Sequence, residues 1–215
     1  MAYKREIYLS ASEDRLERLI EARISAEPAE KRLIDERIWD LFGEEWCVMF
    51  TDLSGFSRNV AKFGIIHFLQ TIYESERLLI PIIERHDGIL LKVEGDSFLV
   101  IFRNVQKGIQ GAIAMQRALV AYNADKPDEE KVLLCVGLGF GKLLRIGDAD
   151  VFGSEVNAAS KLGEDTAKAW EILVTDGVRE RCGEIPDVSF VELDEAPPGA
   201  KRAWKTVYAL APEGT

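Results

Sequence analysis

Two short apolar segments, separated by a long helical pattern, define the first half of the chain. The segments at 46–50 and 89–93 are apolar and β-prone, which predicts buried strands. From 56 to 85, apolar residues recur at helical spacing, and the face expected to pack inward carries Phe63, Ile66, Leu69, Ile72, Leu79 and Ile83. A strand, a helix and a second strand in this order predict a βαβ unit whose two strands run parallel.

The same patterns continue to the end of the chain. A tight turn at Gly95 and Asp96 opens the second half. The predicted elements are then a strand at 97–102, a helix at 105–122, strands at 132–140 and 142–146, a helix that begins after Gly153, a strand at 171–175, a short helix to 182 and strands near 188–193 and 203–210. This order predicts an α+β fold with a ferredoxin-like βαββαβ core and additional C-terminal strands.

Residues 1–45 precede this core and predict an N-terminal helical extension, which leaves 46–215 as the main domain. The positions expected to pack inward are Leu16, Leu19, Ile20 and Ile24 in a first helix, and Leu33, Ile34, Ile38 and Leu41 in a second helix that begins near Pro28. Two interpretations are open. The extension is either a regulatory or dimerising element, or a cover over one edge of the sheet.

Composition limits the functional classes. The 215 residues carry a formal net charge of −10, which argues against a nucleic-acid partner or an anionic membrane surface. The apolar segments are far shorter than the ~20 residues that cross a bilayer, and residues 1–6 lack the apolar core of a signal peptide, so a cytoplasmic location is expected. Cys47, Cys135 and Cys182 have no metal-ligand spacing and are expected to be reduced, buried thiols.

Two aspartates at strand ends are candidates for a shared site. Asp52 follows the strand at 46–50, and Asp96 lies in the turn before the strand at 97–102. If that strand pairs beside the first, the two carboxylates lie side by side, and a hard divalent cation relieves their repulsion. Either aspartate alone is equally typical of a turn or a helix cap. Only the pair therefore supports a metal site.

The residues around these aspartates resemble the catalytic domain of class III nucleotidyl cyclases. The matching segments are Phe-Thr-Asp-Leu-Ser-Gly-Phe-Ser at 50–57, His-Asp-Gly at 86–88 and Lys-Val-Glu-Gly-Asp at 92–96. The resemblance implies conversion of a nucleoside triphosphate to a 3′,5′-cyclic monophosphate and pyrophosphate. It also implies two Mg²⁺ or Mn²⁺ ions per site, held by Asp52 and Asp96.

The same resemblance assigns catalytic roles to two residues on the helix after Gly153. Asn157 stands where the family has an asparagine that orients the ribose. Lys161, four residues later on the same helical face, stands where the family has an arginine that neutralises the reacting phosphate. A lysine provides the charge without the planar, bidentate geometry of arginine, so slower turnover is expected. The alternative for Lys161 is an ordinary solvent-facing lysine.

Three segments are candidates for contact with the nucleotide. The turn with Ser54, Gly55 and Phe56 is expected to present backbone N–H groups to a phosphate at the start of a helix. In the final hairpin, a proline replaces the family's phosphate-binding lysine, and Lys201 or Arg202 is expected to reach the terminal phosphates instead. Alternating glycines at 137–141 leave a flat track against which a nucleotide or a helix can lie.

Base choice and assembly also follow from the resemblance. Lys92 and Asp150 match the pair that recognises adenine in the family, since a lysine can donate to N1 and an aspartate can accept from the N6 amine. ATP is therefore the expected substrate, and GTP or a pyrimidine nucleotide is the alternative. The other interpretation of the pair is structural: Lys92 is a charge on an edge strand, and Asp150 is a turn residue. Family sites form between two subunits, so a homodimer is expected. A catalytically weak module that binds nucleotide or a partner remains the rival function.

Overall fold

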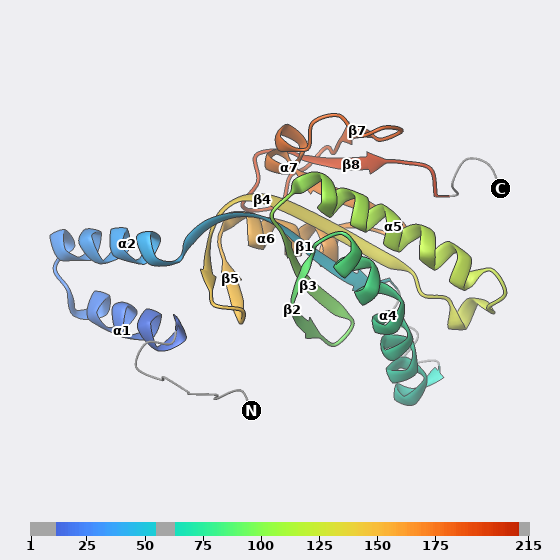
Figure 1. Cartoon of the computed structure of the whole chain (residues 1–215), viewed down its shortest axis with the longest axis horizontal. Coiled ribbons are helices and arrows are strands. Elements are labelled where there is room, and N and C mark those ends of the chain that lie inside the picture. The colour runs from blue at the N-terminus through green and yellow to red at the C-terminus, as the bar shows by residue number, and fades with distance from the viewer. Residues whose placement is uncertain (1–11, 55–62, 211–215) are drawn as a thin grey trace, which may run out of the picture.

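The computed structural model describes residues 12–54 and 63–210, which are arranged around one mixed β-sheet (Figure 1). The strands are β1 Gly43–Leu53, β2 Ile89–Glu94, β3 Ser97–Phe102, β4 Leu134–Ile146, β5 Asp150–Phe152, β6 Ile172–Thr175, β7 Ser189–Glu192 and β8 Ala203–Val207. Their order across the sheet is β2-β3-β1-β4-β6-β8-β7, with β5 paired to the C-terminal end of β4. β3 is antiparallel to both β1 and β2, so β1 and β2 run parallel, as predicted.

Helices cover both faces of this sheet. The described helical segments are α1 Ser12–Ser25, α2 Pro28–Phe42, α4 Ile65–Arg85, α5 Val105–Asn123, the short 3₁₀ turn η2 Asp128–Glu130, α6 Ser154–Ser160, the π-helical turn η3 Lys161–Thr166 and α7 Asp176–Arg181. The mixed α+β fold with N-terminal helices is therefore confirmed. The predicted helix at 56–85 is described only from α4 onward, because 55–62 lie outside the described residues.

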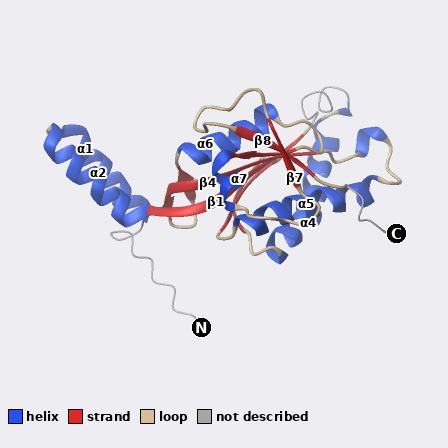
Figure 2. Ribbon diagram, turned by 90° about the horizontal axis from the view of Figure 1, so that it is seen from above, coloured by secondary structure: helices blue, strands red, loops and turns tan. Residues whose placement is uncertain are grey.

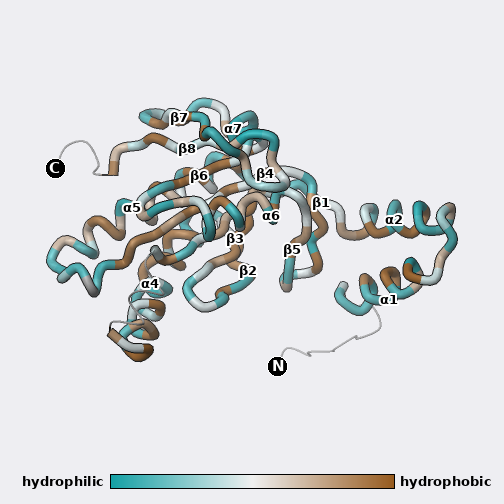
Figure 3. Tube along the Cα trace, turned by 180° about the vertical axis from the view of Figure 1, so that it is seen from behind, coloured by the Kyte–Doolittle hydropathy of each residue, from teal (hydrophilic) through white to brown (hydrophobic). Residues whose placement is uncertain are grey.

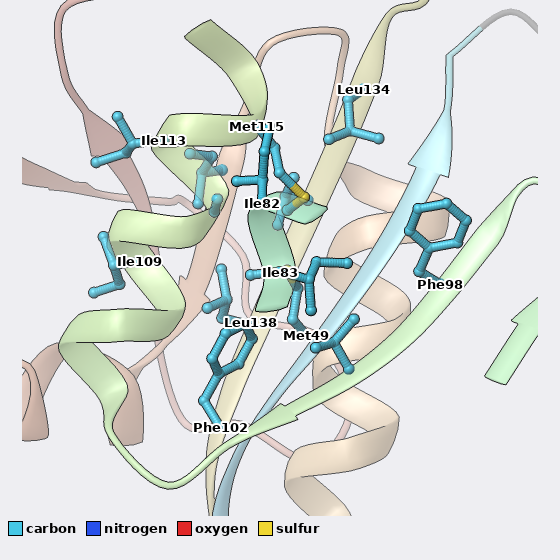
Figure 4. Close-up of a cluster of buried hydrophobic side chains, with 14 of the residues drawn as sticks. Met49, Ile82, Ile83, Phe98, Phe102, Ile109, Ile113, Met115, Leu134 and Leu138 are labelled. Atoms are coloured by element: carbon cyan, nitrogen blue, oxygen red, sulfur yellow. The ribbon is translucent and has the colours of Figure 1, made fainter. Parts of the chain in front are cut away.

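Side chains of β1 alternate between two cores, as the pleat of a strand requires. Cys47 and Met49 belong to the larger core, which α4 and α5 cover with residues such as Ile83 and Ile109 (Figure 4). The even-numbered Trp46 and Val48 belong to a second core on the face that carries α6, together with Val156 and Ala159. Asp52 continues this even-numbered row. The strand period therefore directs Asp52 toward the α6 face.

The alternating glycines of β4 lie under α6. A Cβ at Gly137 would lie 2.2 Å from the carbonyl oxygen of Ala159, and one at Gly139 would lie 2.4 Å from that of Glu155. Only glycine permits this close approach of helix to strand. Of the two occupants considered for the glycine track, the helix is the one observed.

The N-terminal helices α1 and α2 form a hairpin that projects beyond the sheet (Figure 2). Leu19, Ile38 and Phe42 pack together and against Ile146 at the end of β4. The guanidinium of Arg23 pairs with the carboxylate of Asp35 and ties the two helices to each other. The hairpin is thus attached to the core at the outer end of β4, with much of its surface in solvent.

Several positions predicted to pack inward are exposed. In the helical hairpin these are Ile20, Ile24, Leu33 and Leu41, and in α4 they are Ile66 and Leu69. Leu79 and Ile83 of α4 are buried, as predicted. The apolar stripes of α1 and α4 are therefore longer than the part that the described residues cover (Figure 3).

Three smaller expectations are settled by the structure. The two strands predicted at 132–140 and 142–146 are one continuous strand, because β1 pairs with β4 without interruption and holds Gly141 extended. Cys47, Cys135 and Cys182 are buried free thiols, as predicted. No helix in the described part of the chain is long and apolar enough to span a bilayer.

Candidate active site

The structure brings Asp52 and Asp96 side by side. β1 and β3 pair antiparallel, with Thr51 opposite Phe98, so the end of β1 meets the turn that precedes β3. Gly95 makes this turn with a positive φ of 63°, a conformation that favours glycine. The Ser97 hydroxyl lies 3.5 Å from Oδ1 of Asp52. The predicted pairing of the strands is thus observed, and it supplies the predicted pair of carboxylates.

The environment of this pair disfavours two negative charges. Burial, the charge of Asp96 and the charge of Glu164 raise the pKa of Asp52 to about 7, against a smaller opposing effect of hydrogen bonds from the Leu53 backbone and Ser97. Burial also raises the pKa of Asp96, although hydrogen bonds from backbone N–H groups and from Asp52 partly offset it. Without a cation, a proton is therefore readily held between the two carboxyls near neutral pH.

The donor set fits a hard divalent cation that completes its coordination elsewhere. Oδ2 of Asp96 is buried and has no hydrogen-bond partner among the described residues. In residues 12–54 and 63–210, no cluster of three or more histidine, cysteine, aspartate or glutamate side chains could hold a metal by itself. Mg²⁺ is commonly bound by one or two carboxylates together with substrate phosphates and water. Asp52 and Asp96 match that arrangement.

The raised pKa of Asp52 predicts that the difference in thermostability between the wild type and Asp52→Asn depends on pH. A carboxyl whose folded pKa of about 7 exceeds its unfolded value of 3.8 loses stabilisation as pH rises between those values. Without divalent ions, the asparagine variant should therefore be the more thermostable protein at pH 8, by about 2–4 °C per kcal/mol recovered. The difference should shrink toward pH 5. Scanning calorimetry in chelator-treated buffer measures it, and a constant difference from pH 5 to 8 would contradict the assigned environment.

Lys92 and Asp150 form a second charged pair. Nζ of Lys92, on β2, lies 2.5 Å from Oδ2 of Asp150, the first residue of β5. Both line a cavity of about 160 Å³, together with Ser97 and Glu164. Glu94 and five apolar side chains supply the rest of its wall, so the cavity combines an apolar surface with the ammonium of Lys92, the hydroxyl of Ser97 and three carboxylates. The structure thus brings the two predicted base-recognition residues together in one chain.

Asn157 and Lys161 lie four residues apart, and the side chain of each already has a partner within the chain. The side-chain amide of Asn157 donates to the carbonyl oxygen of Pro198 at 3.1 Å, which ties α6 to the C-terminal loop. Nζ of Lys161 lies 2.6 Å from Oδ2 of Asp165, and the lysine side chain is about half exposed at 48%. This exposed ion pair is weak, so a substrate phosphate can displace Asp165 from it.

The predicted phosphate ligands are only partly described. The backbone N–H of Ser54 already donates to the carbonyl oxygen of Leu133 at 2.8 Å, and its side chain is hydrogen-bonded to the Cys135 thiol. Gly55 and Phe56 lie outside the described residues. Lys201 and Arg202 are exposed and belong to the loop that contacts Asn157.

Sequence reasoning missed two acidic residues that shape the site. Glu155 accepts hydrogen bonds from the Phe140 backbone at 3.1 Å and from the Thr175 hydroxyl at 2.7 Å, and so fastens α6 to the sheet. Glu164 lines the cavity and raises the pKa of Asp52 from the π-helical turn. No periodicity reveals Glu164, because a π turn shifts the helical phase by one residue.

Comparison with known proteins agrees with this geometry. A family model described as the adenylate and guanylate cyclase catalytic domain matches residues 43–210. A putative adenylate cyclase 3 of Rhizobium meliloti is 28% identical over 145 residues, which are 67% of this chain and 24% of that protein. A Myxococcus xanthus protein named serine/threonine-protein kinase pkn2 is 30% identical over 148 residues, which are 64% of this chain and 18% of that protein. The chain thus spans a quarter or less of each of these relatives.

Solved cyclase structures share the fold. An adenylate/guanylate cyclase/hydrolase from Silicibacter pomeroyi has a TM-score of 0.67 and 22% identity, covering 78% of this chain and 98% of that one. The adenylyl cyclase CyaB from P. aeruginosa has a TM-score of 0.62 and 19% identity, covering 78% and 95%. At these identities the likeness shows the fold alone. With the family model matching most of its length, the chain belongs to the adenylate and guanylate cyclase catalytic domain family, the class III nucleotidyl cyclases.

Proposed function

We propose that this protein is a class III adenylate cyclase, which converts ATP to 3′,5′-cyclic AMP and pyrophosphate. The observation that supports it most is the meeting of Asp52 and Asp96 at one edge of the sheet, where burial raises the pKa of both carboxyls, in a chain of this family. Carboxylates that disfavour their own ionisation are typical of functional sites rather than of structural turns. The proposal includes the division into a helical extension at 1–45 and a catalytic domain at 46–215.

Asp52 and Asp96 would hold the Mg²⁺ or Mn²⁺ ions, two per site. Such ions supply Lewis-acid chemistry, which lowers the pKa of the ribose 3′-hydroxyl and neutralises triphosphate charge. The chain itself orients the reactants. Asn157 is assigned to the ribose, for which its Oδ1 can accept a hydrogen bond while its amide stays on Pro198. Lys161 is assigned to the charge that develops on the reacting phosphate, after it exchanges Asp165 for that phosphate.

Phosphate binding completes the proposed substrate site. We assign Ser54, Gly55 and Phe56 to the phosphates nearest the metal carboxylates, since this segment follows Asp52 directly. Lys201 and Arg202 are assigned to the terminal phosphates, because their loop is tied to the catalytic helix through Pro198. All these groups bind or orient; the in-line attack of the 3′-oxygen on the α-phosphorus releases pyrophosphate without a dedicated protein base.

ATP is proposed over GTP on the chemistry of the Lys92–Asp150 pair. The ammonium can donate to adenine N1, and the carboxylate can accept from the N6 amine. The contact of 2.5 Å between them pre-arranges the two groups before a base arrives. Guanine presents a carbonyl and an N–H at the corresponding positions, which reverses donor and acceptor. Recognition of GTP would need an acceptor in place of Lys92 and a donor in place of Asp150.

The active species is proposed to be a homodimer with two equivalent sites. Asp52 and Asp96 of one protomer would face Lys92, Asp150, Asn157 and Lys161 of its partner, as the family resemblance implies. Each chain carries both sets, which a two-fold homodimer requires. One experiment separates the possibilities: the purified protein is incubated with Mn²⁺ and each of ATP, GTP, CTP and UTP, and cyclic products are identified by mass spectrometry.

Each outcome of that assay selects one function. Cyclic AMP as the dominant product supports the proposal, whereas a dominant cyclic GMP or pyrimidine product reassigns the substrate. Saturable nucleotide binding without turnover would support a binding module, which the engagement of Asn157 by Pro198 and of Lys161 by Asp165 favours. Binding is measured by calorimetry with the same four nucleotides.

Lys161→Arg is expected to raise kcat about three- to tenfold with little change in KM. Arginine binds a phosphate through two parallel hydrogen bonds, and these strengthen as charge develops in the transition state. Lys161→Ala should lower kcat about 10²-fold. Steady-state kinetics with Mn²⁺–ATP measures both. Asp165→Asn is the matched control, since it frees the lysine without changing it, and equal kcat values for the arginine and alanine variants would contradict the role of Lys161.

A further inference from the structure

Two helices of the chain present apolar faces that residues 12–54 and 63–210 do not cover. On α1, Ile24 is 76% exposed and Ile20 is 42% exposed. On α4, Ile66 is 80%, Tyr73 is 60% and Leu69 is 56% exposed. Both faces follow helical spacing, which normally marks a packed surface. Their exposure in the single chain indicates that another molecule covers them.

The two faces carry complementary charge at their borders. Glu17 and Glu21 lie on α1 beside Ile20 and Ile24, one helical turn apart, and both are exposed. On α4, the exposed Arg77 lies one turn beyond Tyr73, with its guanidinium 5.8 Å from the centre of the Tyr73 ring. Glu76 also lies one turn beyond Tyr73, so the border of the α4 face carries both signs of charge. Arg77 nevertheless offers an opposite charge to the acidic border of α1, whereas two α1 faces would bring their acidic borders together.

Their positions in the fold suit a two-fold dimer. The hairpin and the start of α4 lie at opposite ends of the chain (Figures 1 and 3). In a two-fold dimer, each face on one protomer meets the other face on its partner, so two distant and complementary faces give two equal contacts. Because the α1 face and the α4 face lie far apart on one protomer, they cannot contact each other within that protomer.

Each face also adjoins one half of the candidate site. An open groove of about 740 Å³ runs from Leu16 and Ile20 of α1 to Lys92 and Asp150, with Phe152 of β5 on its wall. On the other side, Leu53 and Ser54, which follow Asp52 directly, line a small pocket together with His67, Phe68 and Thr71 of α4. A dimer that places Lys92 and Asp150 of one protomer opposite Asp52 of the other therefore carries α1 of the first toward α4 of the second.

We propose that α1 of each protomer docks on the N-terminal half of α4 of a second copy of this chain, through Ile20 and Ile24 against Ile66, Leu69 and Tyr73. This inference rests on the homodimer of the proposed function and adds an interface outside its catalytic residues. The N-terminal helical hairpin is then a dimerising element that bridges the two protomers at both sites.

Cysteine cross-linking tests the contact directly. The double variant Ile24→Cys/Tyr73→Cys of the full chain, treated with a short bis-maleimide, should give a covalent dimer as the main product, whereas each single variant should not. The native Cys47, Cys135 and Cys182 are buried, and the single variants measure any cross-linking through them. A double variant that stays monomeric on denaturing gels would overturn the docking.

Equilibrium measurements test the energetics independently. Ile20→Glu/Ile24→Glu should weaken the dimer at least tenfold in sedimentation equilibrium, and Val191→Glu, an equally exposed position on β7, should leave it unchanged. Glu21→Arg should weaken the dimer, and adding Arg77→Glu should restore it. An unchanged dimer in the α1 variants, with Mn²⁺-dependent cyclase activity intact, would overturn this inference and leave the proposed function standing. A cross-linked dimer that forms no cyclic product from any nucleotide would support the docking of α1 on α4 and overturn the proposed function.

Discussion

Asp52→Asn is expected to lower Mn²⁺-dependent cyclic nucleotide formation by about 10³-fold, since a bound metal contributes several kcal/mol of charge stabilisation to the transition state. The asparagine keeps the size of the side chain but removes the negative charge beside Asp96 that is proposed to hold the metal. Oδ2 of Asp96, which is buried and has no hydrogen-bond partner among the described residues, would then be the main carboxylate oxygen left for the cation. Initial rates with Mn²⁺–ATP, measured by chromatography of the product, give the loss.

The fold should survive this change. Asp52 lies at the end of β1, and its charge is unfavourable in the absence of a cation, because burial and Asp96 raise its pKa to about 7. Circular dichroism and the melting temperature should therefore match or exceed those of the wild type at pH 8. Asp187→Asn is the matched control, since it replaces an aspartate in a remote left-handed turn, with a φ of 59°, that asparagine also tolerates. Wild-type activity in Asp52→Asn would remove the metal assignment.

Mixing two inactive variants is expected to restore about a quarter of the wild-type activity. In the proposed homodimer, Asp52→Asn would lack the metal half of each site, and Lys161→Ala would lack the cationic half. In an equimolar mixture about half of the dimers are mixed, and each mixed dimer has one intact site out of two. Activity should therefore rise at least tenfold above that of either variant alone.

The mixture needs two controls. Each variant mixed with itself at the same total concentration should stay inactive, which excludes an effect of concentration. Differently tagged copies, co-purified on both tags, should double the activity of the statistical mixture, because every dimer is then mixed. Mixed dimers without activity would show that one chain supplies both halves of its own site.

The candidate site was predictable where a residue follows directly from strand order. Asp52 ends a buried strand and Asp96 occupies the turn before another, so pairing of β1 with β3 was sufficient to bring them together. Lys92 and Asp150 were assigned through resemblance alone, and their contact depends on the way β5 folds back along β4. Glu164 escaped prediction, because its position depends on one π-helical turn.

The burial of helix faces shows most clearly what the sequence determines and what only the tertiary structure decides. Periodicity in the sequence determined that α1 and α4 each have an apolar face, because local spacing alone fixes which residues share a side of a helix. Only the tertiary structure decided that Leu79 and Ile83 are covered while Ile24 and Ile66 are exposed. Coverage depends on where the sheet ends and on what packs there, which are long-range properties of the whole chain. The sequence thus determined most of the strands, the amphipathic helices and the paired carboxylates, whereas the tertiary structure decided which helix faces the described part of the chain leaves open.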